Sequence, residues 1–295
     1  MSDKVCLNGR IVERGKARIS VMDYGLLYGY GLFETMRSYS GVVFKLEDHF
    51  ERLEESARDI GIGLSKMLPT LEDSIYDTLK ANGRADAYVR LTVTCGEGRP
   101  RINFSEKAKP NFFIITDELP DYRKQYRIGV ELSLSKTVSQ TRLSHTPRLK
   151  TLNYLDRIMA RMEASEKGFF DALIRDEDGL VAEAATSNIF SVKDGVVTTP
   201  PEGSILPGIT RKTVIEIAVE EGLEVKAEGI LLKKILGADE VFMTNSIAQI
   251  LPVTRIDHAT IGNGKPGETT KKISRGYQKK VEAYLSKSKR IRGIR

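Results

Sequence analysis

The sequence predicts an α+β protein made of two unequal halves. Short runs of alternating apolar and polar residues, typical of strands, occur in both halves. Each half also contains segments whose apolar residues recur every three or four positions, as in amphipathic helices. No G-x-G-x-x-G motif follows a predicted strand, so a Rossmann domain is not expected. With 295 residues, the chain is long enough for two domains with a core each.

The first half, residues 1–118, is predicted to form the smaller domain. Asn8-Gly9 separates two strand-like runs, and this dipeptide favours a type I′ hairpin turn. An amphipathic helix follows later, with apolar positions at Leu46, Phe50, Leu53, Ala57 and Ile60. A second helix is expected to begin with Thr70 as its N-cap. Two longer strands are predicted over 87–94 and 111–116.

The polar segment 119–127 is predicted to be an interdomain linker, because charged residues and a proline interrupt the strand pattern there. The second domain then covers residues 128–295. In it, a helix over 153–166 is expected to face inward with its large apolar residues, Leu155, Ile158, Met159 and Met162. Strands are predicted over 129–134, 172–175, 180–184, 189–192 and 196–198, and a further helix near Thr210.

Composition and charge favour a soluble globular protein over a nucleic-acid-binding or membrane protein. Apolar residues make up 40% and charged residues 29%, as in soluble globular proteins, and no signal-peptide core follows Met1, so a cytosolic location is expected. The net charge of +6 lies largely in a tail that carries Lys287, Lys289, Arg290, Arg292 and Arg295. A solvated tail without aromatic residues argues against a nucleic-acid partner, and no apolar run is long enough for a membrane span. Cys6 and Cys95 lack the spacing of a metal site or a disulfide framework.

Four parts of the chain carry motifs that can be compared with known families. They are Tyr28–Arg37 with Phe44–Leu53, Arg148–Leu155, Val181–Phe190, and Ile205–Arg211 with Thr244-Asn245-Ser246. In this order, and over nearly the whole chain, they resemble the class IV aminotransferases. The resemblance implies a fold type IV enzyme that uses pyridoxal 5′-phosphate (PLP). It also implies a smaller N-terminal α/β domain and a larger C-terminal pseudo-barrel domain, with PLP at their interface.

Two residues of these motifs match the chemistry that PLP requires. The cofactor needs a lysine amine that bonds to it covalently and later shuttles the α-proton of the substrate, and Lys150 matches this residue. The cofactor withdraws electrons well only while its pyridine nitrogen is protonated, which a facing carboxylate favours. Glu183 matches that carboxylate and lies at the end of an apolar strand, where an unpaired acid is costly.

Other residues match the groups that hold the cofactor. Gly208-Ile209-Thr210 opens a helix, so the free amides and the positive end of the helix dipole form an anion site for the phosphate. The resemblance adds the hydroxyls of Thr210 and Ser246 and the cation of Arg52, and it places the Tyr154 hydroxyl on the phenolate oxygen of the cofactor. On periodicity alone, Arg52 is an exposed helix arginine and Tyr154, one helical turn after Lys150, is a core tyrosine.

The resemblance to the branched-chain members also implies a set of substrate residues: Tyr28, Phe33, Arg37, Tyr88 and Arg90. There, arginines and tyrosines receive the α-carboxylate and the aromatic rings line an apolar pocket. Tyr88 and Arg90 alternate along a strand and therefore point to one face, although a paired surface arginine and a half-buried tyrosine fit the pattern equally.

Two positions depart from the branched-chain pattern and resemble the aminodeoxychorismate lyases of the same family. Thr35 replaces a glycine, and Asn245–Gln249, which includes Ile247, replaces a Gly-Thr-Ala-Ala-Glu turn whose amides help to bind the carboxylate. The bulkier Thr35 and Ile247 would narrow the pocket. The D-amino-acid transaminases usually carry an arginine where this chain has Cys95.

The resulting hypothesis is a transaminase of branched-chain amino acid biosynthesis. It moves the amino group of an L-branched-chain amino acid to 2-oxoglutarate by a ping-pong mechanism. A homodimer or larger homo-oligomer is expected, because in relatives a loop of the neighbouring subunit completes the pocket. The alternatives are a lyase that releases pyruvate and 4-aminobenzoate, a D-amino-acid transaminase, and a degenerate binding protein, against which the intact Lys150, Glu183, Arg52 and Thr210 argue.

Overall fold

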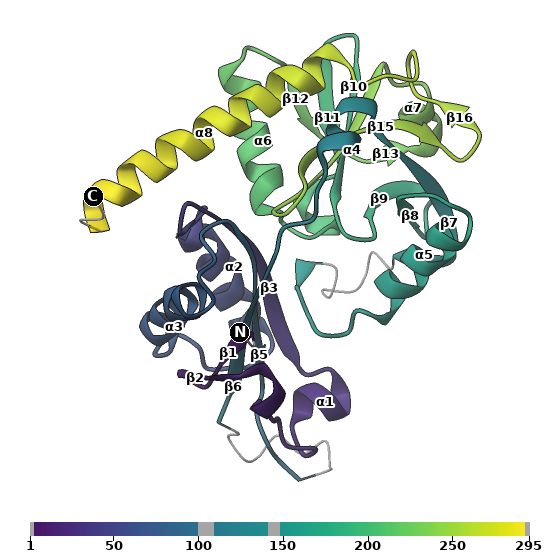
Figure 1. The fold of residues 1–295 in the computed structure, drawn as a ribbon. Helices are drawn as coiled ribbons and strands as arrows, with labels where there is room; N and C mark the ends of the chain where they lie inside the picture. The colour runs from purple at the N-terminus through teal and green to yellow at the C-terminus, as the bar shows by residue number, and fades with distance from the viewer. Residues whose placement is uncertain (1–2, 100–108, 141–147, 293–295) are drawn as a thin grey trace. The chain divides into compact units, whose positions relative to one another are not determined.

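The computed structural model describes residues 3–99, 109–140 and 148–292, which form two compact units (Figure 1). Unit 1 contains the described parts of Met1–Leu119, Leu149–Asn153 and Tyr284–Arg295. Unit 2 contains those of Pro120–Arg148 and Tyr154–Ala283. The short segment around Lys150 thus belongs to unit 1, although the chain on both sides of it belongs to unit 2. The domain limits at 118 and 128 stay a prediction.

Unit 1 is a six-stranded antiparallel sheet with strand order β2-β1-β6-β5-β3-β4. Its strands are β1 (Lys4–Leu7), β2 (Arg10–Glu13), β3 (Gly31–Tyr39), β4 (Val42–Val43), β5 (Ala87–Thr94) and β6 (Asn111–Asp117). Its helices are α1 (Tyr24–Tyr28), α2 (Leu46–Asp59) and α3 (Leu68–Ala81), with a 3₁₀ turn, η1, at Arg14–Lys16. The core packs α2 and α3 against the sheet through buried residues such as Met36, Leu53, Leu71, Ile75 and Leu91.

The turns of unit 1 agree with the sequence, but one helix start does not. Asn8 and Gly9 have φ of 50° and 80°, as a type I′ hairpin requires. α3 begins at Leu68, with Met67 as its N-cap and Pro69 in its first turn, so the prediction that Thr70 caps this helix was wrong. Proline favours the first turn of a helix because its φ is already helical and its missing N–H has no helical acceptor there.

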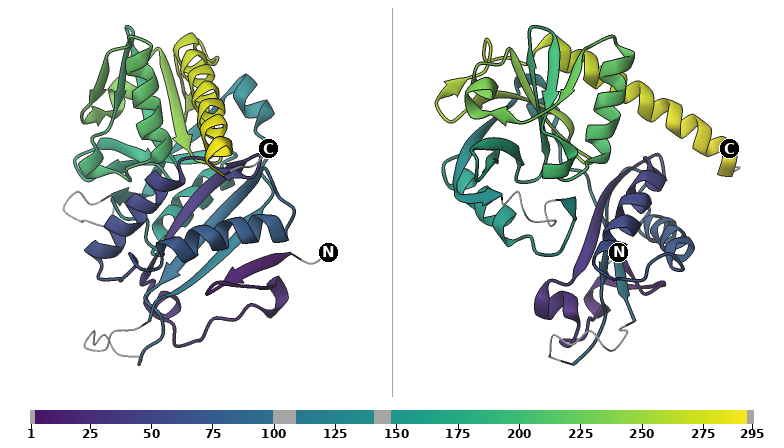
Figure 2. Two further views of the ribbon diagram at one scale, coloured as in Figure 1. Left: turned by 90° about the vertical axis from the view of Figure 1, so that its left-hand side faces the viewer. Right: turned by 180° about the vertical axis from the view of Figure 1, so that it is seen from behind.

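Unit 2 is built on a mixed ten-stranded sheet with order β12-β11-β10-β14-β15-β7-β8-β9-β13, in which β16 also pairs with β15. Its strands are β7 (Val130–Gln140), β8 (Asp171–Asp176), β9 (Leu180–Ala184), β10 (Asn188–Lys193), β11 (Val196–Thr199), β12 (Val225–Ala227), β13 (Ile230–Leu231), β14 (Glu240–Asn245), β15 (Gln249–Ile256) and β16 (Ala259–Thr260). The helices are α4 (Arg123–Ile128), α5 (Leu155–Glu166), α6 (Ile209–Glu220) and α7 (Leu232–Leu236), with a 3₁₀ turn, η3, at Glu202–Ser204. The sheet curls, and α6 packs against β14 (Figure 2). The predicted α+β class is confirmed.

The face that α5 buries differs from the prediction. The four large apolar residues expected to face inward, Leu155, Ile158, Met159 and Met162, are 45% to 66% exposed. Instead, Ala160 and Ala164 are fully buried against Ala172 and Ile174 of β8 and against Ala185. Small side chains let the helix lie close to β7 and β8, and close packing of this kind decided which face turned inward.

The last helix, α8 (Glu268–Arg292), belongs to both units, with its residues from Tyr284 in unit 1. The Tyr284 ring lies 5.2 Å from that of Phe44, and its hydroxyl donates to Glu47 at 2.6 Å. Of the predicted basic tail, Arg295 and the side chains of Lys289, Arg290 and Arg292 lie outside the described residues. In the described part of the chain, no helix has the length and apolar character needed to cross a membrane.

Candidate active site

Lys150 lies in a short extended segment that pairs with the start of β3. The Phe33 amide donates to the Lys150 carbonyl at 2.9 Å, and the Leu152 amide donates to the Gly31 carbonyl at 3.0 Å. A Cβ on Gly31 would lie 2.7 Å from the Leu152 side chain, so only glycine allows this approach. Lys150 is therefore held by a strand-like pairing, and the expectation that Tyr154 follows it by one helical turn was wrong.

The Lys150 amine lies over one face of the sheet in unit 1. Its Nζ is 4.5 Å from the centroid of the Phe33 ring, and Arg90 Cζ is 3.8 Å from the same centroid. In the β3–β5 register, Thr35 is opposite Arg90 and Arg37 is opposite Tyr88, and directly opposed residues share a face. The structure thus brings together the predicted residues Phe33, Arg37, Tyr88, Arg90 and Lys150. A face with three cations and aromatic rings suits a small anion with an apolar body.

Tyr28 has a different environment from these residues. It ends α1, its ring packs 5.5 Å from that of Tyr24, and it is 39% exposed. Gly29 follows it in the left-handed conformation, with φ of 65°, and terminates the helix. The substrate role of Tyr28 stays a prediction, as does that of the sheet-face residues.

Arg52 is buried in a cluster on the other side of the same sheet, where α2 covers β3. Its Nε donates to Glu34 Oε1 at 2.9 Å and its Nη2 to Glu34 Oε2 at 2.6 Å, a bidentate pair. His49, one turn earlier on α2, donates from Nδ1 to Glu34 Oε2 at 2.7 Å. The side chains of Glu34, His49 and Arg52 are 1%, 2% and 8% exposed. Arg52 is therefore not the exposed helix arginine that periodicity suggests.

Electrostatics keeps this cluster in one charge state. Burial by itself raises the pKa of the Glu34 carboxyl. Arg52 and His49 lower it by a larger amount, so the pKa is about 2. Burial lowers the pKa of His49 and outweighs the stabilising effect of Glu34. At neutral pH, Glu34 is therefore anionic, His49 is neutral and its Nδ1 carries a proton. Sequence reasoning missed Glu34 and His49, although a glutamate inside an apolar strand signals that it has a buried partner.

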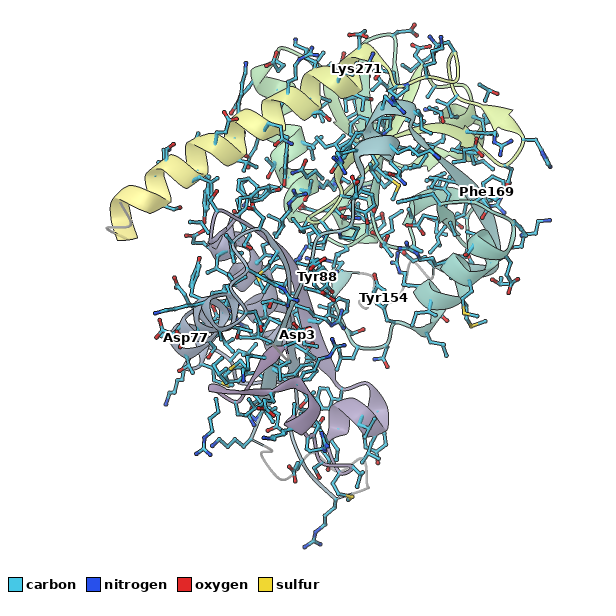
Figure 3. The ribbon with its side chains drawn as sticks, viewed as in Figure 1. Asp3, Asp77, Tyr88, Tyr154, Phe169 and Lys271 are labelled. Carbon is cyan, nitrogen blue, oxygen red and sulfur yellow. The ribbon has the colours of Figure 1, made fainter. Side chains whose placement is uncertain are left out.

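In unit 2, Glu183 lies on β9 and is held by two side chains. Its Oε1 accepts from Arg157 Nη2 of α5, and its Oε2 accepts from Asn188 Nδ2 at 3.2 Å. Asn188 Nδ2 also donates to the Leu206 carbonyl at 2.9 Å. Tyr154 immediately precedes α5 (Figure 3). Its hydroxyl donates to the Ala185 carbonyl at 3.3 Å. Sequence reasoning assigned no role to Arg157 or Asn188.

Helix α6 begins at the Gly208-Ile209-Thr210 motif, where the sequence predicts a helix start. Gly208 is the N-cap, Ile209 and Thr210 are buried in the first turn, and the first amides of a helix have no helical acceptors. A Cβ on Gly208 would lie 2.0 Å from Asn188 Oδ1, so glycine is required for this turn to pack on Asn188. Arg211 points elsewhere, since its Nη2 donates to the Pro200 carbonyl at 2.9 Å.

The turn between β14 and β15 carries Ser246 and Ile247 and is closed by Asn245. Asn245 Oδ1 accepts from the amides of Ile247 and Ala248 at 3.0 and 2.7 Å, and its Nδ2 donates to Ser187 Oγ at 2.9 Å. Ser246 is half-buried and Ile247 is buried. Sequence reasoning assigned no contact to the Asn245 side chain, which occupies two amides of the turn.

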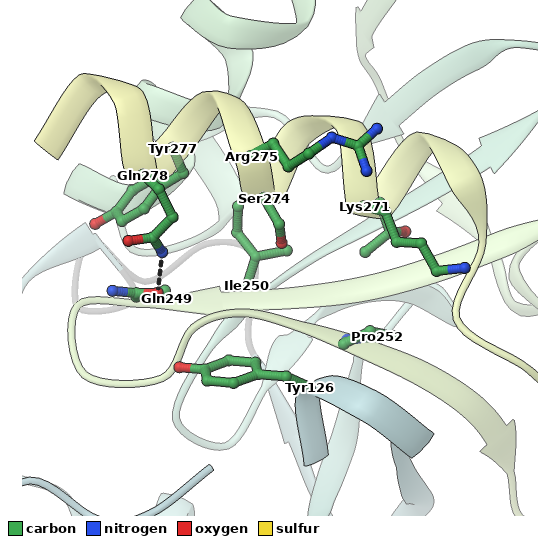
Figure 4. Close-up of a pocket in the computed structure, with 10 residues that line it drawn as sticks. Tyr126, Gln249, Ile250, Pro252, Lys271, Ser274, Arg275, Tyr277 and Gln278 are labelled. Carbon is green, nitrogen blue, oxygen red and sulfur yellow. Dashed lines mark hydrogen bonds between the residues drawn. The ribbon is translucent and has the colours of Figure 1, made fainter. Parts of the chain in front are cut away.

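A separate pocket of about 310 Å³ lies in unit 2 between α8, β15 and α4 (Figure 4). Its lining includes Tyr126, Pro252, Lys271 and Arg275, and Gln278 Nε2 donates to Gln249 Oε1 across it at 2.7 Å. None of the predicted site residues lines this pocket, so it is not the candidate active site.

Comparison with known proteins identifies the family. The family model for class IV amino-transferases matches residues 31–256. A putative branched-chain-amino-acid aminotransferase of Methanocaldococcus jannaschii is 40% identical over 93% of this chain and 95% of its own. A D-alanine aminotransferase of Bacillus licheniformis is 33% identical, covering 97% and 99%. An aminodeoxychorismate lyase of Bacillus subtilis is 33% identical, covering 94% of each.

Solved structures show the same fold. The branched-chain amino acid aminotransferase of Escherichia coli superposes with a TM-score of 0.89 at 30% identity, over 94% of each chain. A second branched-chain amino acid aminotransferase, solved in complex with N-(5′-phosphopyridoxyl)-L-glutamate, has a TM-score of 0.87 at 30% identity, over 97% of this chain and 95% of its own. The predicted fold type is confirmed, and the chain belongs to the class IV aminotransferases.

Proposed function

We propose that this PLP-dependent class IV aminotransferase moves the amino group of an L-branched-chain amino acid to 2-oxoglutarate in a ping-pong cycle. The observation that carries the proposal is the face of unit 1 that carries Phe33, Arg37, Tyr88 and Arg90, with the Lys150 amine and the Arg90 guanidinium both close to the Phe33 ring. Guanidinium groups suit the carboxylates of both substrates, and the aromatic rings suit a branched apolar side chain. Relatives named as branched-chain aminotransferases support this choice.

The residues of the chain fit PLP. The start of α6, with Gly208 packed on Asn188, presents amides and the Thr210 hydroxyl to an anion such as the phosphate. Glu183 is a buried carboxylate with a fixed orientation, as a partner of the ring nitrogen requires. When bound, PLP supplies an electron sink that makes the α-proton of the substrate acidic.

Each of these residues has a proposed role. The Lys150 amine would hold the cofactor covalently and, once released from it, would act as the base that accepts and returns the α-proton of the substrate. Glu183 holds the proton of the ring nitrogen, and the Tyr154 hydroxyl binds the phenolate oxygen. In unit 2, the amides of Ile209 and Thr210 and the hydroxyls of Thr210 and Ser246 would bind the phosphate. The family resemblance alone assigns Arg52 of unit 1 to the phosphate as well.

Four substrate residues follow from the same face of unit 1: Arg37 and Arg90 receive carboxylates, while Phe33 and Tyr88 contact the apolar side chain. Ile247 of unit 2 is proposed as a substrate residue on the strength of the family resemblance alone. Tyr28 is proposed as a further pocket residue on the strength of the family resemblance alone. A homodimer is proposed on the same ground, and a cytosolic location on the composition of the chain. Light scattering of the purified protein, which gives its molar mass, tests the dimer.

A second candidate function is the lyase that releases pyruvate and 4-aminobenzoate. The observation that favours it is the closed turn at Asn245, whose side chain occupies the amides of Ile247 and Ala248. A glycine at position 245, as in the branched-chain pattern, has no side chain to do this. The lyase of Bacillus subtilis among the relatives keeps this alternative open. A transaminase needs an acceptor oxo acid, whereas the lyase releases pyruvate from a single substrate.

The visible spectrum of the purified protein, before and after adding L-leucine without an acceptor, tests the proposal. We expect L-leucine to bleach the yellow band of the PLP-loaded protein. The Lys150→Ala variant should lack this band and should not complete multiple turnovers. A band that L-leucine leaves unchanged would contradict the branched-chain function. Bleaching by D-alanine, or pyruvate released from aminodeoxychorismate, would then identify one of the alternatives.

A further inference from the structure

Arg157, a residue of α5 without an assigned role, contacts the carboxylate of Glu183 directly. Its Nη2 donates to Glu183 Oε1 and also to Gln140 Oε1 at 3.2 Å, while its Nη1 donates to the Ala184 carbonyl at 3.1 Å. The acceptors come from the end of β7 and from the end of β9, so the plane of the guanidinium is fixed by groups on two strands. These three hydrogen bonds hold the guanidinium in one orientation against Glu183.

The Arg157–Glu183 pair is largely shielded from water. The side chain of Glu183 is 4% exposed and that of Arg157 is 20% exposed. Desolvation opposes the charged form of Arg157, but the charge of Glu183 and the hydrogen bond to it outweigh this effect, and the pKa of Arg157 is raised. Arg157 is therefore a permanent cation beside Glu183. In such a setting a charge acts over several ångströms with little screening by salt.

We propose that Arg157 is a positioning residue that orients the Glu183 carboxylate and reduces the negative charge that it presents to the ring nitrogen of the cofactor. This inference rests on the proposed function, in which Glu183 faces that nitrogen. A lone buried carboxylate would hold a proton on the nitrogen firmly. A carboxylate already paired with an arginine attracts the same proton less, because the two fixed charges of the pair cancel.

Other ionisable groups also surround the pair, and they do not cancel this effect. The charges of Tyr154 and Asp171 raise the pKa of Arg157. The charge of Glu183 raises the pKa of Arg211 of α6, against the larger effect of burial. Arg161, one turn after Arg157 on α5, lowers the pKa of Asp171 through its charge. Among these groups, Arg157 is the cation that donates a hydrogen bond to Glu183, so its charge acts at the shortest distance. Its effect on the ring nitrogen should therefore be the largest.

The experiment measures directly whether the ring nitrogen of PLP is protonated. The wild type and the Arg157→Gln variant are loaded with PLP labelled with ¹⁵N in the ring, and the ¹⁵N chemical shift, which separates protonated from unprotonated pyridine nitrogen, is followed against pH. We expect the nitrogen of the variant to lose its proton about one pH unit higher than that of the wild type. A purely structural role for Arg157 would lower stability without raising this midpoint.

Two further variants serve as controls. Arg157→Lys keeps the positive charge and should keep the midpoint near that of the wild type. Gln140→Glu fills the same space and places a second carboxylate on Arg157 Nη2, so it should raise the midpoint by a smaller amount. Because this second variant leaves Arg157 in place, it tests the inference even where Arg157→Gln does not fold.

The outcomes separate this inference from the proposed function. A midpoint that is unchanged or lowered in Arg157→Gln and Gln140→Glu would overturn the role of Arg157. A wild-type nitrogen that stays fully protonated at every accessible pH would overturn it as well. Glu183→Gln is the reference, because it should remove the proton from the nitrogen. If Glu183→Gln leaves the ¹⁵N shift unchanged, the assignment of Glu183 in the proposed function fails instead.

Discussion

Each unit contains an arginine–glutamate pair in which the carboxylate is the less exposed member, and the two pairs differ in the groups that bind the carboxylate. In unit 1, Glu34 accepts from both Arg52 and His49 and is 1% exposed, so the carboxylate is the innermost member. In unit 2, Glu183 accepts one hydrogen bond on each oxygen, from Arg157 and Asn188. We propose that Arg52 faces the cofactor in the first pair and that Glu183 does so in the second.

The comparison teaches that the partner of a functional residue defines its role. Glu34 fixes Arg52 so that the guanidinium is held in one orientation for an anion, and His49 supplies a third donor to the carboxylate. Arg157 fixes Glu183 so that the carboxylate is held for a cation. A residue of the same type is therefore a support in one unit and a cofactor ligand in the other, and substitutions should separate the two roles.

The largest difference in kcat is expected between the Glu183→Gln and Glu34→Gln variants. Glu183→Gln should fold and bind PLP, but kcat should fall by about two to four orders of magnitude, the usual range for a lost proton-transfer partner. Glu34→Gln, assayed with saturating PLP, should lower kcat far less, because it acts only through Arg52. Steady-state kinetics of both variants provides the measurement. Equal losses of kcat would mean that the two carboxylates do not differ in role.

Arg52→Ala should have nearly as large an effect, but on the free energy of unfolding and on the affinity for PLP. It leaves Glu34 buried without its cation, which typically costs about 3–5 kcal/mol. The dissociation constant for PLP should rise, and added PLP should restore activity in the fraction that stays folded. Arg52→Lys is the matched control, since it keeps the charge but loses the bidentate geometry. Activity that excess PLP does not restore would contradict the phosphate assignment.

The Glu34 cluster should also determine part of the acid stability. The pKa of Glu34 is about 2 in the folded protein against 4.5 for an unperturbed glutamate, so protonation favours the unfolded state. Its contribution, ~3 kcal/mol, is present above pH 4.5 and is lost as the pH falls towards 2. Urea unfolding of wild type and Glu34→Gln over this range measures it. Identical pH dependence in both proteins would refute this role for Glu34.

The smallest effect is expected for His49, which donates one hydrogen bond to Glu34. His49→Phe keeps a ring of similar size but removes the donor, and it should cost ~1–3 kcal/mol, because Glu34 loses a partner in a buried site. His49→Asn, whose Nδ2 can donate from a similar position, should retain part of this stability. Thermal unfolding of both variants compares them. A more stable His49→Phe protein would show that the hydrogen bond is dispensable.

The sequence by itself determined most strands, the hairpin at Asn8-Gly9, the helix start at Gly208 and the family motifs around Lys150 and Glu183. These features depend on local chemistry: the period of apolar residues, the conformational freedom of glycine and the free amides of a helix end. The roles of the site residues remain predictions, but their places in the chain followed from short motifs.

Only the tertiary structure decided which residues support the site. Arg157 meets Glu183 across 26 residues and Arg52 meets Glu34 across 18, and neither separation has a local period. The buried face of α5 was likewise decided by the close approach of Ala160 and Ala164 to the strands beneath it, which overrode the larger apolar side chains. Packing and the pairing of buried charges act between distant segments, so these partners are set by the fold as a whole.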